Sequence, residues 1–190
     1  MPGFRKQPQF HRSMKNEILG HLIGGCVYKV YLAIFPPYGE HDFQDIDMRL
    51  GLAMQEQPER IVQIGTDLRD IWTPTVEICA PPDTVFQGEQ LECRMKQWMN
   101  REIDSNFHLE YYDMSERHEF RSIAGCEVMD YRLLMIEGNQ SPFGVRLYFP
   151  NDYILSFPNV DGNTIETSKF NPNCCLRRFA PLGNVVEASM

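Results

Sequence analysis

Short segments in which apolar and polar residues alternate dominate this chain, a pattern typical of β-strands with one buried face. Eight segments have this character: CVYKVYLAIF, DIDMRL, RIVQIG, TPTVEIC, CEVMDYRLLMI, GVRLYF, YILSFP and NTIETSK. Pro150, Asn151 and Asp152 separate GVRLYF from YILSFP, so these two strands are predicted to form a hairpin. FHLEYYD, at 107–113, adds one half-exposed strand.

One segment has helical rather than strand periodicity. In GEQLECRMKQWMNREI, four large apolar side chains share one helical face: Leu91, Met95, Trp98 and Met99. We predict a helix over about 83–104 whose Met and Trp stripe packs in the core. Residues 1–20 are basic and polar and are predicted to form a tail or a short helix that Ser13 caps.

These elements predict an α+β fold that is rich in β-structure. Two related antiparallel β units, joined by the amphipathic helix, are expected within a single domain over 21–190. The evidence for two related units is a short motif: LIGGC ends at Cys26, and SIAGC ends 100 residues later at Cys126. Because strands follow each copy in the same order, we predict an internal duplication with pseudo-repeats at 22–79 and 122–168.

The first copy of this motif also resembles the cleavage site of a bacterial lipoprotein signal. Such a signal needs an apolar stretch of about 7–15 residues before the cysteine. Here the stretch before Cys26 carries Glu17 and His21, and the second copy lies inside the chain, where it cannot act as a signal. We therefore interpret both glycine-cysteine pairs as structural corners, and expect a cytoplasmic protein that keeps its N-terminus.

Composition places the chain among globular proteins. Its 190 residues are 43% hydrophobic and 12% aromatic, enough to bury a core. The six cysteines include no C-x-x-C pair, so the common zinc-finger and thioredoxin-like spacings are absent, and free thiols in a reducing compartment are expected. No apolar run approaches the roughly 20 residues of a membrane span, so no membrane partner is predicted.

The charge balance narrows the choice of partner. Lys and Arg number 18 against 26 Asp and Glu, a formal net charge of −8. Nucleic-acid binding requires a basic face that displaces counterions, so we predict no nucleic-acid partner. An acidic protein instead attracts a basic partner, because opposite fields steer the encounter.

One cluster carries candidate chemistry. EHDFQDIDM places five acidic or imidazole side chains close together: Glu40, His41, Asp42, Asp45 and Asp47. Oxygen ligands suit hard cations, but Asp45 and Asp47 alternate with Ile46 and Met48 as on the outer face of a strand. We interpret the cluster as a solvated acidic edge and predict neither a metal nor another cofactor.

A second set of residues carries side chains that can act as acids or bases, but the sequence does not indicate a substrate pocket around them. His108, Glu110 and Asp113 lie close in sequence, as do His118 and Glu119. Neighbouring residues on a strand point to opposite faces, so His118 and Glu119 are not expected to converge. The chain also lacks a G-x-S-x-G elbow, a P-loop and a dinucleotide fingerprint, so no catalytic residue is predicted.

The segment FGVRLYFPNDYILSFPNVDGNTIET resembles the closing part of small immunity proteins of bacterial polymorphic-toxin systems. There a strand, a turn and a second strand are followed by a turn that contains Asp. The resemblance covers about a quarter of the chain and carries over no site residue. It implies a cytoplasmic protein that binds one cognate toxin and blocks the toxin's active site.

An immunity role, together with the acidic charge, predicts where a toxin with a basic cleft would bind. The expected partner-binding residues are acids and neighbouring aromatics: Glu40, Asp42, Phe43, Asp45, Asp47, Glu110, Tyr112 and Asp113. Two alternatives stay open. One is a small metal-dependent hydrolase that uses the 40–47 cluster, and the other is an adaptor protein of a phage or secretion machine.

Overall fold

The structure, a computed structural model, describes residues 9–36, 46–67, 70–103, 108–160, 162–172 and 176–189, and for 9–15 and 70–72 the backbone only. The described residues form two β-sheets of mainly antiparallel strands with few helices, which confirms the predicted α+β class. Among these residues, no helix has the length and apolar character needed to cross a bilayer.

Six strands form the first sheet. In spatial order they are β4 (Asp70–Cys79), β3 (Gln57–Asp67), β2 (Met48–Met54), β1 (Val27–Ile34), β6 (Glu110–Asp113) and β5 (Val85–Gln87). Every neighbouring pair is antiparallel except β5 and β6.

Five antiparallel strands form the second sheet: β10 (Asn163–Glu166), β9 (Tyr153–Pro158), β8 (Gly144–Tyr148), β7 (Asp130–Ile136) and β11 (Val185–Ala188). The helical elements are α1 (Gln9–Leu22), η2 (Gly88–Gln90), α2 (Leu91–Met99), α3 (Leu176–Phe179) and η3 (Ala180–Leu182).

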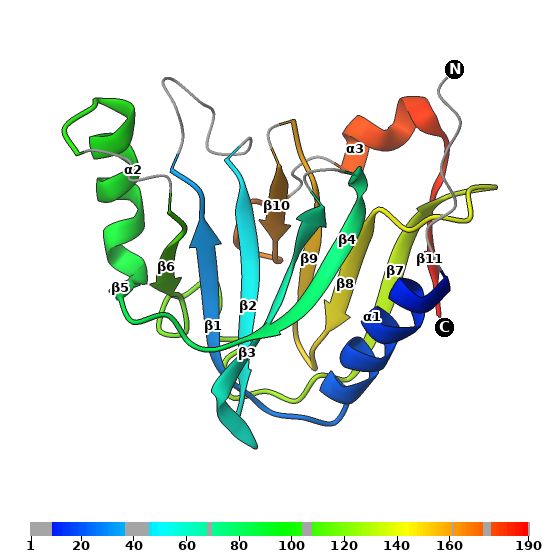
Figure 1. Cartoon of the computed structure of the whole chain (residues 1–190), viewed down its shortest axis with the longest axis horizontal. Helices are drawn as coiled ribbons and strands as arrows, with labels where there is room; N and C mark the ends of the chain where they lie inside the picture. Colours follow the sequence, from blue (N-terminus) through cyan, green and yellow to red (C-terminus); the bar gives the residue numbers. More distant parts are fainter. Residues whose placement is uncertain are drawn as a thin grey trace.

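The two sheets pack against each other around one main core. Val30 and Leu52 from the six-stranded sheet and Leu147 and Ile154 from the five-stranded sheet belong to the same cluster of buried side chains. In Figure 1, β4 crosses in front of β8 and β9, which it contacts, and α2 stands beside β6. Since alternate strand residues face this core, the predicted alternation of apolar residues accounts for the inner faces of both sheets.

Helix α1 belongs to the domain and is longer than the predicted short helix. It runs from Gln9 to Leu22, so Ser13 lies inside it and does not cap it. Leu19 and Leu22 are buried in the main core, at 1% and 2% exposure. Residues 9–20 therefore belong to a helix rather than a tail, and the buried Leu19 and Leu22 of this helix, three residues apart, are part of the main core.

The predicted linking helix is shorter than expected, and two strands, β5 and β11, were missed. Helix α2 covers only Leu91–Met99, because β5 and the 3-10 turn η2 precede it, although Leu91, Met95 and Trp98 are buried as predicted. Strand β11 comes from the last segment, which has weak periodicity, and it pairs with β7. Its four residues lie at a sheet edge, where an alternating pattern is not required.

The two sheets share one strand order. In each, four consecutive strands form a meander, and a later strand that follows a helix adds beside the first: β6 beside β1, and β11 beside β7. The strand order that the two sheets share agrees with the predicted pseudo-repeats. The origin of the repeats by duplication stays a prediction.

The two Gly-Cys corners contact each other through reciprocal backbone hydrogen bonds. Gly24 N–H donates to the Val128 carbonyl, and Gly125 N–H donates to the Val27 carbonyl. A second such pair joins Val27 N–H to the Cys126 carbonyl and Val128 N–H to the Gly25 carbonyl. Gly24 and Gly125 both have φ of +81°, so these two glycines occupy equivalent positions in the two corners. They are 101 residues apart, one residue more than the separation of Cys26 and Cys126 in the sequence motif.

Candidate functional site

Four of the predicted partner-binding residues, Glu40, Asp42, Phe43 and Asp45, lie outside the described residues, as does His41 of the same cluster. The ends of their segment are described. At the end of β1, Ile34 pairs with Met48 at the start of β2 on one side and with Glu110 of β6 on the other. The fold therefore brings Asp47 and Glu110 to the end of the six-stranded sheet from which the acidic segment leaves.

Asp47 does not lie on the outer face of a strand, as the alternation predicted. It precedes β2, and its Oδ1 accepts a hydrogen bond of 3.0 Å from the Asn163 backbone N–H of the other sheet. A Cβ at Gly162 would come within 2.4 Å of the Asp47 side chain. Burial raises the pKa of Asp47, against the opposing effects of the Asn163 N–H and the Arg49 charge. Asp47 thus links the two sheets.

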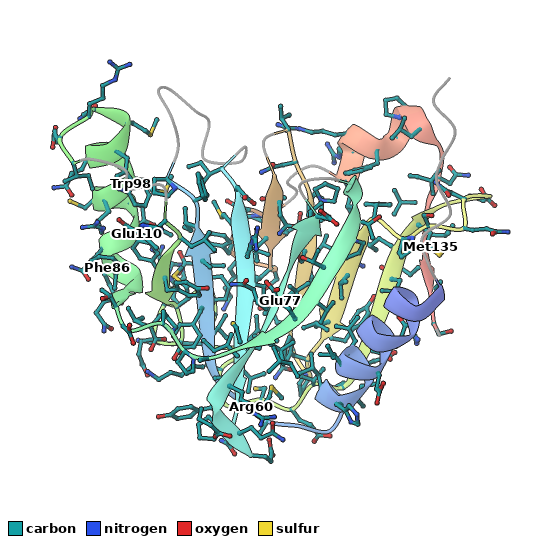
Figure 2. All side chains as sticks on the ribbon, in the orientation of Figure 1. Arg60, Glu77, Phe86, Trp98, Glu110 and Met135 are labelled. Carbon is teal, nitrogen blue, oxygen red and sulfur yellow. The ribbon has the colours of Figure 1, made fainter. Side chains whose placement is uncertain are left out.

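Glu110 and Tyr112 hold helix α2 against β6. The Arg94 guanidinium donates to both carboxylate oxygens of Glu110, at 2.6 and 2.7 Å, and lies 4.0 Å from the centre of the Phe86 ring. The Tyr112 hydroxyl donates to Glu110 at 2.7 Å. Figure 2 shows Glu110, Phe86 and Trp98 together between the helix and the sheet. Tyr112 is fully buried, so its side chain is not part of the exposed surface.

Asp113 is occupied by contacts within the chain. Lys29 Nζ lies 2.7 Å from Oδ2, while Oδ1 accepts the backbone N–H and the hydroxyl of Ser115. Burial acts to raise the pKa of Asp113, but the hydrogen bonds from Lys29 and Ser115 outweigh it and hold the pKa below its ordinary value. The carboxylate therefore fixes the turn that follows β6.

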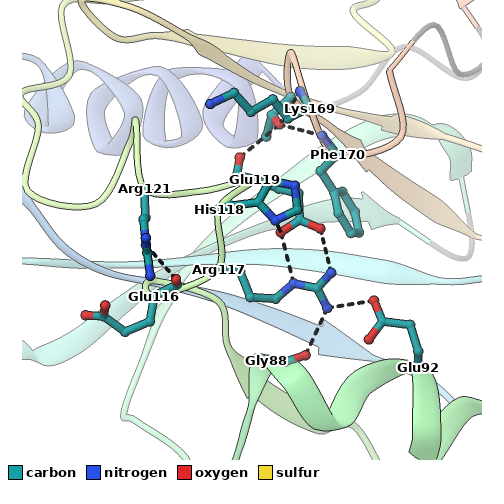
Figure 3. A network of polar contacts seen from close by, with 10 residues as sticks. Gly88, Glu92, Glu116, Arg117, His118, Glu119, Arg121, Lys169 and Phe170 are labelled. Carbon is teal, nitrogen blue, oxygen red and sulfur yellow. Dashed lines mark hydrogen bonds and ion pairs between the residues drawn. The ribbon is translucent and has the colours of Figure 1, made fainter.

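The residues after that turn carry a network of polar contacts centred on Arg117 (Figure 3). Arg117 donates to both oxygens of Glu119, at 2.5 and 3.0 Å, to Glu92 of α2 at 2.6 Å, and to the Gly88 carbonyl at 3.1 Å. The side chains of Arg117 and Glu119 are only 14% and 9% exposed. The network therefore fixes the start of α2 against the turn.

The expectation that His118 and Glu119 diverge is wrong. Both lie in the turn rather than in a strand, and His118 Nδ1 is 3.2 Å from Glu119 Oε2. Glu119 is nevertheless held by Arg117, whose hydrogen bonds keep the Glu119 pKa below its ordinary value. A carboxylate fixed in this way stays ionised, so its geometry is that of a structural ion pair.

Metal-binding and thiol chemistry have few candidates. Within the described ranges, which exclude most of the 40–47 cluster, no three His, Cys, Asp or Glu side chains lie close enough to hold a metal. Cys26, Cys79, Cys93 and Cys126 are free thiols, and Cys174 and Cys175 lie outside the description.

A groove of about 360 Å³ lies at the opposite end of β1 from the acidic segment. Its apolar lining comes from four elements: Ile18 and Leu22 of α1, Met54 of β2, Val62 of β3 and Ile78 of β4. Gly24, Gly25, His21, Glu56, Gln57 and Arg60 complete it. Sequence reasoning missed this groove, because no local pattern indicates that these distant residues converge.

Comparison of the chain with protein-family models, curated proteins and solved structures finds no match.

Proposed function

We propose that this chain is a cytoplasmic bacterial immunity protein that neutralises one cognate toxin by occluding its active site. The proposal is carried by the net charge of −8 together with the position of the acidic segment. The described residues that flank that segment lie at one end of the six-stranded sheet, where Ile34 pairs with Met48 and with Glu110.

We propose that only some of the predicted acids serve this role. Asp47, Glu110 and Asp113 already accept hydrogen bonds or form ion pairs within the chain. A carboxylate that is neutralised by its own chain contributes less to the field that a partner meets. We therefore assign the steering charge to Glu40, Asp42 and Asp45, with Phe43 between them as an aromatic anchor.

Electrostatic steering predicts a kinetic signature. Opposite fields raise the association rate by about 10-fold to 1,000-fold at low ionic strength, and salt removes the gain as the Debye length shrinks to about 3 Å at 1 M. Dissociation depends on buried contacts and therefore responds less to salt.

The test is the association rate with the product of the neighbouring gene across a salt series. The double variant Asp42→Lys/Asp45→Lys should bind about tenfold more slowly at low salt and nearly normally at 1 M salt. Asp47 is left unchanged because its carboxylate joins the sheets. The control is Glu89→Lys/Glu116→Lys, which makes the same charge change at exposed positions near the other end of β6.

Two results would refute the proposal. If both double variants slow association equally, net charge alone acts and the acidic segment is not the interface. If the neighbouring product does not bind the wild-type chain at any salt concentration, the immunity role is wrong.

A further inference from the structure

The groove at the base of β1 combines an exposed apolar lining with charges of both signs. Ile78 is 51% exposed there, although large aliphatic side chains are usually buried. Glu56 follows β2 in a turn, and Arg60 lies on β3 four residues later, so both line the same groove. Figure 2 shows Arg60 at the lower end of the molecule, far from Glu110.

Close packing at the Gly24-Gly25 corner shapes the groove. A Cβ at Gly25 would come within 2.8 Å of Met54 Cε and within 3.2 Å of the Leu22 carbonyl. Glycine at this position leaves room for the Met54 methyl group, and Met54 lines the groove together with Ile18 and Leu22 of α1. The apolar surface is therefore built by the same corner that joins the two sheets.

Within the part of the chain that the structure describes, no side chain neutralises the charged groups of the groove. Among the described residues, neither Glu56 nor Arg60 forms an ion pair, with each other or with any other side chain, and His21 forms none either. An anion and a cation beside one apolar surface are complementary to a molecule that carries both charges and an apolar body.

We propose that this groove binds a free α-amino acid with a large apolar side chain, of the leucine, methionine or phenylalanine class. The ligand carboxylate pairs with Arg60 and the ammonium pairs with Glu56, while the side chain covers Ile78, Ile18 and Met54, which are at least partly exposed. A volume of about 360 Å³ lies within the range of about 300–1,000 Å³ that is typical of small-molecule pockets. Release of water from the apolar surfaces drives binding, and the charges orient the ligand.

The experiment is a titration of the full-length protein with leucine, methionine and phenylalanine, followed by NMR or calorimetry. Because the groove is open to solvent, we expect a dissociation constant on the order of 1 mM. N-acetyl-leucine amide keeps the side chain without either charge, and glycine keeps both charges without the side chain. Each should bind at least about tenfold more weakly than leucine if both halves of the ligand contribute.

Variants assign the contacts. Arg60→Gln and Glu56→Gln should each weaken leucine binding about threefold to fivefold, as for partly exposed ion pairs, and Ile78→Ser should weaken it more. The controls Arg177→Gln and Glu89→Gln remove the same charges from exposed positions on α3 and η2 and should leave binding unchanged. Unaltered unfolding midpoints would show that all five variants stay folded.

Three results would overturn the proposal. Absence of leucine binding at ten times the expected constant would show that the groove does not take this ligand. Equal binding of N-acetyl-leucine amide would show a purely apolar site, such as one for a partner's side chain. Equal loss in the control variants would place the effect outside the groove. None of these results bears on the toxin-binding proposal, which concerns the other end of β1.

Discussion

Removal of the Arg117 donors should destabilise the fold strongly. Arg117→Met deletes the guanidinium but keeps an aliphatic stem, which matters because the Arg117 Cδ lies only 2.8 Å from where a Cβ at Gly88 would stand. The variant leaves the Glu119 carboxylate, 9% exposed, without its two hydrogen bonds from Arg117.

The expected loss of unfolding free energy is about 3 kcal/mol. Breaking a fully buried ion pair from one side costs about 3–5 kcal/mol, and we take the lower end because both side chains retain some exposure. The bond to Glu92 adds little, since the Glu92 side chain is 49% exposed. With a urea slope of about 2 kcal/mol per M, the midpoint should fall by about 1.5 M.

The assay is urea unfolding of the wild type, Arg117→Met and the matched control Arg121→Met. Arg121 lies in the same turn, is exposed, and donates to the Glu116 carbonyl, so its replacement should cost below about 1 kcal/mol. Adding Glu119→Gln to Arg117→Met should recover part of the loss, because an unpaired amide is less costly to bury than an unpaired carboxylate.

The loss should also depend on pH. Hydrogen bonds from Arg117 hold the folded-state pKa of Glu119 below its ordinary value of 4.5. A depressed pKa contributes stability that is present above the unfolded-state value and is lost as the pH falls below about 4.5 toward the folded-state value. The difference between wild type and Arg117→Met should therefore shrink in acid. Equal urea midpoints for the Arg117 and Arg121 variants at pH 7 would refute this reasoning.

Three further substitutions test the contacts that join the two sheets. Asp47→Asn keeps an acceptor for the Asn163 N–H and should match or exceed the wild-type unfolding free energy at pH 7, by up to about 1 kcal/mol. Burial raises the Asp47 pKa, so the contribution of the carboxylate to stability declines as the pH rises above 3.8. A clear loss of stability in the amide variant would contradict this. Gly24→Ala and Gly125→Ala should each lower the unfolding free energy by about 1–2 kcal/mol, because both glycines have φ of +81°. Neither site is crowded, so the cost comes from the backbone conformation. An unchanged midpoint of thermal or urea unfolding in either variant would show that the corner relaxes.

Most of the secondary structure was predictable because it depends on neighbours in the chain. The eight strands, the hairpin at Pro150–Asp152 and the buried stripe of α2 follow from the period of apolar positions and from turn-forming residues. The pattern of apolar positions did not predict two short strands. It missed β5, which precedes α2, and β11, which lies at a sheet edge.

The candidate site was less predictable than the fold. Its residues are polar, and a polar residue carries no sign of whether its partner will be water or another part of the chain. Asp47 meets an N–H group 116 residues away, and Glu110 meets Arg94 across the gap between helix and sheet. Acids that the sequence placed at the surface are in these cases parts of internal networks.

The amino-acid sequence alone was enough to predict the β-rich class and the main strands, and it carries a net charge of −8. Local periodicity and composition are sufficient for these, since each depends on a few adjacent residues or on a sum over the chain. The folded protein alone shows that β6 and β11 return beside the first strand of each meander, that Tyr112 is buried, and that four separate elements line one groove. These features depend on which surfaces meet when two sheets pack, and packing joins residues whose separation along the chain leaves no local pattern.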